Sequence, residues 1–321
     1  MILNTANMNI DRRDFMLSAA AFAAVAPGAA AAQSREQTGD AELDARQREV
    51  DAITPAEFAA YWHPGTSLAP EALAAAAAAY PVLGRLEAAF DKVVREVRET
   101  AVDDASRPAV WYVYNMGLLV KTPKTLFSVD LHHRRAEELA PLLDFALITH
   151  NHDDHYTERF KVAMDRGQRK SVVNNFFDNY GVADRKFGGY TRENGKTFDF
   201  GDVRIVANLC DHNSYLIDYT TAFEIQVGDY TIFHSGDCCS RAKLRPSRRP
   251  DLWVLHPKCG MDAAEACAAI MPKTAVVAHL QEMGHAKGRY RWTYRDGLDV
   301  KAKIEAAGFE AVMPLWGDRI A

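Results

Sequence analysis

The sequence predicts an α/β fold in which two β-sheets lie inside and helices lie outside, with a helical extension in front of it. Two observations lead to this prediction. Apolar residues recur at helical spacing in residues 33–108, whereas short β-rich runs bounded by turn residues begin at residue 109. Late in the chain, strand-like and helix-like segments alternate. We therefore expect a helical N-terminal extension over 33–108 and one main domain over 109–321.

The first 32 residues are expected to be a signal peptide rather than part of the fold. Arg12 and Arg13 form a twin-arginine pattern, followed by the apolar run 16–26 and by small residues at 30–32. The alternative is an anchoring helix that merely carries two arginines, but the run is too short to span a bilayer comfortably. We expect export by the twin-arginine machinery, a periplasmic location and no stable membrane insertion.

The extension over 33–108 is predicted to form two to four helices that wrap the main domain. Thr54-Pro55 and Ala69-Pro70 are helix starts with proline in the first turn. The segment 81–102 has apolar residues at helical spacing with charges between them. No motif in this region indicates a separate function.

The main domain is predicted to contain short strands joined by turns, with two helices near its end. Gly201-Asp202 and Gly228-Asp229 are the turn signals of two hairpins. The expected strands are 110–114, 117–121, 125–129, 146–149, 197–200, 203–209, 222–227, 230–234, 252–255, 274–278 and 311–314, and the expected helices are 262–271 and 300–307.

Composition and charge limit the class of function. The chain has 321 residues, 48% hydrophobic and 25% charged, which is typical of a globular protein. Its formal net charge of −5 argues against a nucleic-acid partner, because phosphate binding favours a basic surface. Its five cysteines are an odd number, and adjacent Cys238 and Cys239 are poorly placed to bond with each other.

A dense group of histidines and carboxylates follows the expected strand 146–149. His150, His152, Asp154 and His155 fall within six residues. Two side chains that lie two residues apart after the end of a strand, here His150 and His152, can point toward one metal ion. Asp154 and His155, further along the loop, can face a second ion. Imidazole and carboxylate are ligands for zinc, manganese or iron. We interpret the cluster as a metal site rather than a polar surface loop.

Three later residues supply the partners of a two-metal site, each of them after an expected strand. His212 would complete a three-histidine site with His150 and His152. Asp237 would bridge both metals, which a neutral ligand would do poorly. His279 would join Asp154 and His155 on the second metal.

These motifs resemble the metallo-β-lactamase superfamily over roughly residues 109–321. The resemblance rests on His150-x-His152-x-Asp154-His155, His212, Ser235-Gly236-Asp237 and His279, preceded by the strand and turn 126–130. It implies a four-layer αββα sandwich. Within the superfamily the chain looks similar to the branch of L-ascorbate-6-phosphate lactonase and N-acyl-phosphatidylethanolamine phospholipase D. It departs from that branch at 114–117 and at 256–260, where substrate would be contacted.

The predicted chemistry is hydrolysis at a centre of two divalent metal ions, with zinc as the default and manganese or iron also compatible with these ligands. The ions would share a bridging water and lower its pKa, so that hydroxide attacks a carbonyl or phosphoryl group. Asp154 would bind the second metal and orient or deprotonate the water. His285 is the candidate proton donor to the leaving group, the alternative being a solvent-exposed loop histidine. His132-His133 is interpreted either as support for the ligands or as a surface turn.

The expected substrate is a small molecule carrying an ester, a lactone or a phosphodiester. One alternative is β-lactam hydrolysis, and another is a non-catalytic metal-binding protein of the same fold. A nuclease is disfavoured because the chain is acidic and no added RNA-processing domain is recognisable.

Overall fold

The computed structural model describes residues 38–62, 69–104, 106–168, 170–176, 185–186 and 194–321. The chain from Thr38 to Ala321 forms one compact unit. The predicted signal peptide, residues 1–32, lies outside the described residues, so it stays a prediction. None of the helices in the described ranges is long and apolar enough to cross a membrane.

Four helices precede the first strand among the described residues, at the upper end of the predicted number: α2 (Ala41–Asp51), α3 (Pro55–Trp62), α4 (Pro70–Ala79) and α5 (Pro81–Glu99). The predicted starts at Thr54-Pro55 and Ala69-Pro70 are confirmed. Thr54 Oγ1 accepts a hydrogen bond from the Glu57 N–H, and α4 has Pro70 in its first turn. Proline is tolerated there because the first helical N–H groups have no partner within the helix.

The first sheet has six strands in chain order, β1-β2-β3-β4-β5-β6. Strands β1 to β3 pair antiparallel, and β3 to β6 pair parallel. Its strands are β1 (Ala109–Tyr112), β2 (Leu118–Lys121), β3 (Leu126–Val129), β4 (Phe145–Leu147), β5 (Ser171–Asn174) and β6 (Arg185–Lys186).

The second sheet has seven strands in the order β13-β12-β11-β10-β9-β8-β7. Its hairpin half, β7 to β10, is antiparallel, and β10 to β13 are parallel. Its strands are β7 (Lys196–Phe200), β8 (Val203–Cys210), β9 (Thr220–Val227), β10 (Tyr230–His234), β11 (Leu252–Leu255), β12 (Thr274–Val277) and β13 (Glu310–Val312).

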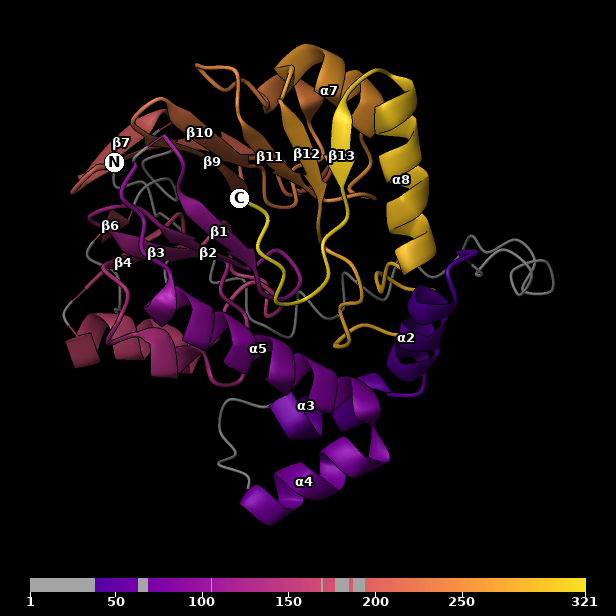
Figure 1. The fold of residues 1–321 in the computed structure, drawn as a ribbon. Coiled ribbons are helices and arrows are strands. Elements are labelled where there is room, and N and C mark those ends of the chain that lie inside the picture. The colour runs from indigo at the N-terminus through magenta and orange to yellow at the C-terminus, as the bar shows by residue number, and fades with distance from the viewer. Residues whose placement is uncertain (1–37, 63–68, 105, 169, 177–184, 187–193) are drawn as a thin grey trace, which may run out of the picture. The chain divides into compact units, whose positions relative to one another are not determined.

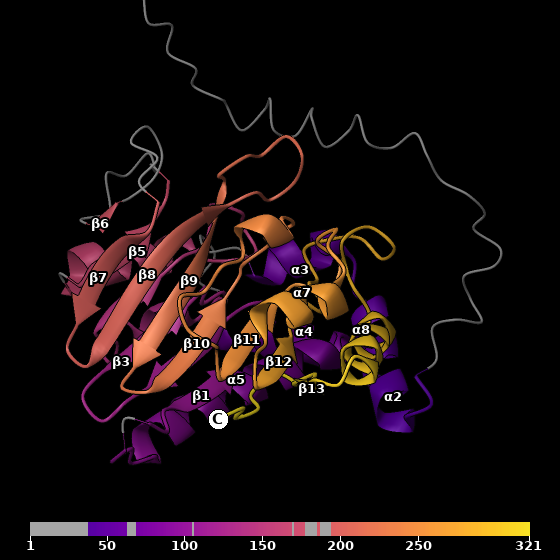
Figure 2. The same cartoon turned by 90° about the horizontal axis from the view of Figure 1, so that it is seen from above.

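Alternating side chains bury both faces of each sheet. In β11, Leu252 and Val254 join the apolar core between the sheets, whereas Trp253 and Leu255 face the helices α7 (Ala263–Ile270) and α8 (Tyr294–Ala306). Figure 2 shows α7 lying over β11 and β12. The helix–sheet–sheet–helix order visible in Figure 1 confirms the predicted α/β architecture.

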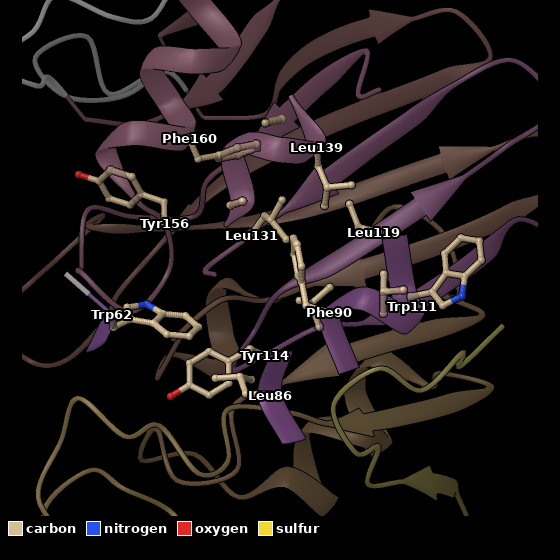
Figure 3. Close-up of a cluster of buried hydrophobic side chains, with 14 of the residues drawn as sticks. Trp62, Leu86, Phe90, Trp111, Tyr114, Leu119, Leu131, Leu139, Tyr156 and Phe160 are labelled. Carbon is tan, nitrogen blue, oxygen red and sulfur yellow. The ribbon is translucent and has the colours of Figure 1, made fainter. Parts of the chain in front are cut away.

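The outer face of the first sheet is covered by the N-terminal helices. Leu86 and Phe90 of α5 pack in one buried cluster with Trp111 of β1 and Leu119 of β2 (Figure 3). The buried residues of α5 recur three and four positions apart, so they form an apolar stripe along one side of the helix. This stripe faces the first sheet and fixes the position of the helix.

Some elements are absent from the sequence-based prediction or extend beyond it. Strand β5 and helix α6 (Glu158–Val162) were not expected, and α8 begins six residues before its predicted start at 300. Short helical turns also occur: η1 (Ala136–Leu139), η2 (Ala163–Gly167) and η3 (Arg241–Lys243).

Candidate metal centre

The predicted ligands follow the carboxyl ends of four strands. Strand β4 of the first sheet leads into the loop that begins at His150. In the second sheet, β8 and β10 both run antiparallel to β9, and β12 runs parallel to β10 through β11. The ends of β8, β10 and β12 therefore lie at one edge of the sheet, where His212, Asp237 and His279 follow.

The first group of predicted ligands consists of three histidines and one carboxylate. One donor atom from each of His150, His152, His212 and Asp237 lies within 4.8 Å of the others. The ring centroids of His150 and His152 are 4.4 Å apart, and those of His152 and His212 are 4.6 Å apart. This is the grouping that the sequence predicts for one metal ion.

The second group consists of Asp154, His155 and His279, whose donor atoms also lie within 4.8 Å of one another. Asp154 Oδ2 is 3.2 Å from His279 Nε2 and 3.7 Å from His155 Nε2. These are the three residues that the sequence assigns to the second ion.

Asp237 lies between the two groups. Its Oδ2 is 3.5 Å from His212 Nε2 in the first group and 3.4 Å from His279 Nε2 in the second, and its Oδ1 is 3.4 Å from His155 Nε2. A single carboxylate thus reaches ligand atoms of both groups, as the predicted bridging role requires.

Several of these donor atoms are buried and make no hydrogen bond to the described part of the chain. They are the Nε2 atoms of His150, His155, His212 and His279 and the Oδ1 atom of Asp237. Unpaired buried polar atoms are costly, and a cation shared among them would satisfy them all. Imidazole nitrogen and carboxylate oxygen are ligands of zinc and related divalent ions, so the residues fit such a group.

The charges of the site favour a cation. Burial lowers the pKa of His152 to about 4, so this ring is neutral at pH 7, the form in which histidine binds a metal. Burial opposes ionisation of Asp237, but neighbouring His279 and His155 hold the pKa of its carboxyl well below the usual range. Burial lowers the pKa of His279, yet Asp237 and Asp154 raise it to about 10. In the absence of a metal ion, protonated histidines balance the negative charge of the buried carboxylates. A bound metal ion would replace these protons.

Asp130, which the sequence reasoning placed only in a motif, orients His155. Its Oδ2 lies 2.8 Å from His155 Nδ1, and both side chains are fully buried. The Thr149 backbone N–H and hydroxyl also donate to this carboxylate, at 2.8 and 2.7 Å. Because an ionised carboxylate only accepts, Nδ1 carries the proton and Nε2 keeps its lone pair for the centre.

Asn115 connects two members of the second group. The side-chain Nδ2 of Asn115 donates to the backbone oxygen and to Oδ2 of Asp154, at 2.9 and 3.1 Å. The backbone carbonyl of Asn115 accepts a hydrogen bond from the backbone N–H of His279 at 2.8 Å. In the sequence, 114–117 stands out only as a departure from a family motif. A polar residue before Gly117 was the available signal, but its partners are distant in sequence.

Gly236 allows Asp237 to enter the site. Its φ of +52° is left-handed, and a Cβ there would lie 2.9 Å from both Thr149 Cβ and Thr220 Oγ1. Glycine is therefore required for the loop after β10 to approach the loop after β4.

The candidate proton donor His285 lies outside both ligand groups. Its Nδ1 is 2.5 Å from Oε2 of Glu282, whose carboxylate is buried, while its own side chain is 40% exposed. Burial lowers the pKa of His285, but the hydrogen bond and charge of Glu282 raise it by more, and Asp154 and His279 also influence it. His285 is thus partly open to solvent and within electrostatic reach of the centre, and its proton-donor role stays a prediction.

The surface-turn interpretation of His132-His133 is wrong, because both side chains are buried. Trp62 Nε1 donates to His132 Nε2 at 2.7 Å, and the His133 ring stacks on Phe90 at 3.9 Å. The helices of the extension cover this turn, which the local sequence does not indicate.

His256, which the sequence analysis did not single out, also lies at the centre. Its donor atom lies within 4.8 Å of those of Asp237 and His279, and its ring centroid is 4.1 Å from that of His279. Its place directly after β11, between two strands that lead to ligands, was the signal that could have identified it.

Comparison with known proteins points to one class. The chain is 33% identical over 164 residues to a UPF0173 metal-dependent hydrolase from Symbiobacterium thermophilum, a match that covers 45% of this chain and 68% of that protein. No family model matches the chain.

The architecture recurs in a solved structure of another protein. Igni18, a metallo hydrolase from Ignicoccus hospitalis, is similar with a TM-score of 0.51 at 16% identity, covering 66% of this chain and 97% of that one. The metallo-β-lactamase fold protein YhfI from Bacillus subtilis has a TM-score of 0.47 at 13% identity, with 66% and 97% covered. At such low identity, the likeness to Igni18 shows a shared fold and nothing about substrate.

Proposed function

The chain belongs to the UPF0173 family of metal-dependent hydrolases and has the metallo-β-lactamase fold, and we propose that it uses two divalent metal ions to hydrolyse a small ester, lactone or phosphodiester. Zinc is the proposed metal, because three histidines and a carboxylate suit it. When bound, the ions would polarise the carbonyl or phosphoryl group and make water nucleophilic near neutral pH.

One observation carries this proposal: two groups of buried donor atoms share the carboxylate of Asp237. A single metal site would explain one group and leave the other with unpaired buried nitrogen atoms. Two ions with one shared carboxylate account for both.

The protein's own residues hold and orient the reactants. Asp154, fixed by Asn115, would bind at the second group and orient or deprotonate the attacking water. His285 would give a proton to the leaving group from Nε2, since its Nδ1 is engaged by Glu282. The acidic partner favours the imidazolium, which carries a proton on both nitrogens, and it keeps the Nδ1 proton in place after the Nε2 proton has been given to the leaving group.

The proposed substrate class follows from the resemblance to the lactonase and phospholipase D branch. The residues that support it are the ligand motifs and the closing segment 262–280, which looks like that branch's strand–helix–strand. The loops at 114–117 and 256–260 differ from the branch, so selectivity within the class is proposed to reside there.

The test is a hydrolysis panel with zinc-loaded protein, comprising an aryl ester, a lactone, bis(p-nitrophenyl) phosphate and nitrocefin. We expect turnover of at least one of the first three, and loss to the background rate in Asp237→Ala. Asp153→Asn is the matched control, because Asp153 lies in the same loop but is exposed and belongs to neither group. Turnover of nitrocefin alone would favour the β-lactamase alternative, and no turnover at all would favour the non-catalytic one.

Export to the periplasm through the twin-arginine machinery is also proposed, supported by Arg12, Arg13 and the apolar run 16–26. A fusion of residues 1–40 to a reporter should reach the periplasm, and the fusion with both arginines changed to lysine should stay in the cytoplasm. Equal export of the two fusions would refute this route.

A further inference from the structure

The residue His256 follows β11 and lies between the strands that lead to two predicted ligands. Strands β10, β11 and β12 are parallel neighbours, so their carboxyl ends meet at the same edge. Asp237 follows β10, and His279 follows β12. His256 is 7% exposed, and its ring lies at 39° to the ring of His279 with centroids 4.1 Å apart. The sheet therefore delivers a further polar side chain to the centre.

One hydrogen bond determines which ring nitrogen of His256 carries a proton. The backbone N–H of Lys258 donates to His256 Nδ1 at 2.9 Å. A backbone N–H can only donate, so Nδ1 must be unprotonated. An imidazolium would have a second N–H facing this donor and is excluded by the same contact. The ring is therefore neutral, with its proton on Nε2.

Metal binding through Nε2 would remove the only proton of this ring and leave an imidazolate, because Nδ1 is already unprotonated, so Nε2 is a poor metal ligand. Nε2 makes no hydrogen bond to any residue in the part of the chain that the structure describes. One ring nitrogen of His256 lies within 4.8 Å of donor atoms of Asp237 and His279, and Nε2 is the nitrogen that no described residue engages. A substrate held at the centre would provide an acceptor for this N–H.

The loop after His256 keeps the ring in this orientation. Lys258 Nζ forms a salt bridge of 2.9 Å to Asp296 at the start of α8, and Cys259 Sγ donates to the His256 carbonyl at 3.5 Å. Trp292 packs edge-on to the ring, with centroids 6.2 Å apart. A ring flip would break the bond from Lys258, so the donor is oriented before substrate arrives.

We propose that His256 donates a hydrogen bond from Nε2 to an oxygen atom of the substrate's ester, lactone or phosphoryl group, and that it is not a metal ligand. The inference rests on the proposed hydrolytic centre. A fixed donor aimed at the oxygen where negative charge develops accelerates such reactions, and it also strengthens binding of an oxyanion. His256 would then distinguish substrates that carry such an oxygen from those that do not.

The experiment compares His256→Phe, which keeps a ring of similar volume and removes the donor, with His256→Gln, which keeps an N–H donor. The probe is inorganic phosphate, titrated calorimetrically into zinc-loaded protein. We expect the phosphate Kd to rise about tenfold in His256→Phe, the effect of losing one hydrogen bond to a charged group, and to stay near the original value in His256→Gln. Thermal unfolding of both variants checks that they fold.

Metal content and the cobalt(II) absorption spectrum provide the second measurement, independent of turnover. Both should be unchanged in His256→Phe if His256 only donates a hydrogen bond. Loss of one metal equivalent or a shift of the cobalt bands would make it a ligand and overturn the inference. An unchanged phosphate Kd in His256→Phe, or no phosphate binding by the unaltered protein, would overturn it as well. If Asp237→Ala keeps its full metal content, the proposed centre itself fails, whatever His256 does.

Discussion

At the scale of single residues, the centre depends on hydrogen bonds that select one nitrogen of each ring. The Asp130 carboxylate holds the proton of His155 on Nδ1, whereas the Lys258 N–H holds that of His256 on Nε2. The two histidines lie at the same centre, yet the first can bind a metal through Nε2 and the second is a poor ligand there. The hydrogen-bond partner of each histidine ring, rather than the position of the ring alone, decides how well that ring can bind a metal.

Asp130→Asn should weaken metal binding about 10- to 100-fold, the usual effect of removing the group that orients a ligating histidine. The asparagine amide no longer guarantees an acceptor for Nδ1, so the Nε2 lone pair of His155 is less available. A chelator-competition titration measures the change. Asp144→Asn is the control, because Asp144 accepts a backbone N–H at the opposite end of β4 from the centre. Equal affinities of the two variants would contradict the orienting role.

Gly236→Ala should destabilise the protein by about 2–4 kcal/mol, since it combines a left-handed backbone with a close contact. The added Cβ would lie 2.9 Å from Thr149 Cβ and Thr220 Oγ1. Gly308→Ala is matched, because Gly308 has a φ of +88° and a Cβ added there would meet nothing within 4 Å. Chemical denaturation of Gly308→Ala should show a smaller loss of unfolding free energy, about 1 kcal/mol. Similar losses at both sites would show that the close approach is unimportant.

The two groups of candidate ligands could be predicted from the sequence because each member is a histidine or a carboxylate in a loop that follows a strand. Asp130 and His256 also follow strands directly, yet like Asn115 they were not given roles. What each contributes depends on residues that the fold brings to it, as with Asp130 and His155, 25 residues apart. Only the sheet order reveals such partners, and the sequence does not state which strands become neighbours.

At the scale of elements, the start of α8 connects the outer helices to the centre. Thr293 and Asp296 form a capping box, and Asp296 also binds Lys258, whose N–H orients His256. This helix was predicted only for 300–307, whereas its cap lies at Thr293, seven residues earlier. Strand β5 was missed because four residues carry little periodicity of their own.

Thr293→Ala should lower the free energy of unfolding by about 1 kcal/mol, the usual effect of losing a helix cap. Its side chain accepts a hydrogen bond from the Asp296 N–H, which would lose its partner in the first turn. Urea denaturation measures the change. Lys301→Ala, on the surface of the same helix, should change stability by less than about 0.5 kcal/mol. A loss as large in Lys301→Ala would argue against a specific effect of the cap.

Asp296 gives this cap a pH dependence. Burial raises the pKa of its carboxyl, but the Thr293 N–H and Lys258 outweigh this and lower it. A lowered folded pKa contributes stability above the ordinary aspartate pKa of about 3.9, and this contribution is lost as pH falls through the folded value. The stability difference between the unaltered protein and Asp296→Asn should be constant near neutrality and shrink below about pH 4. A difference that grows on acidification would contradict this sign.

At the scale of the whole molecule, the centre joins the two sheets. His150 to His155 follow β4 of the first sheet, whereas His212, Asp237 and His279 follow strands of the second. The apolar core between the sheets ends where these loops begin, so donor atoms replace apolar contacts at this edge. Ions bound here would hold the sheets together where the hydrophobic core does not.

Removal of metal should therefore lower the unfolding temperature of the whole protein. A ligand that binds only the folded state at 100 times its Kd stabilises it by about 2.7 kcal/mol, which corresponds to roughly 4–5 °C for a chain of this size. Thermal unfolding before and after chelation measures the shift. The shift should shrink as pH falls, because protons compete for His279, whose metal-free pKa is raised to about 10. Asp237→Ala should show little shift, and an unchanged unfolding temperature of the unaltered protein after chelation would contradict a structural role for the ions.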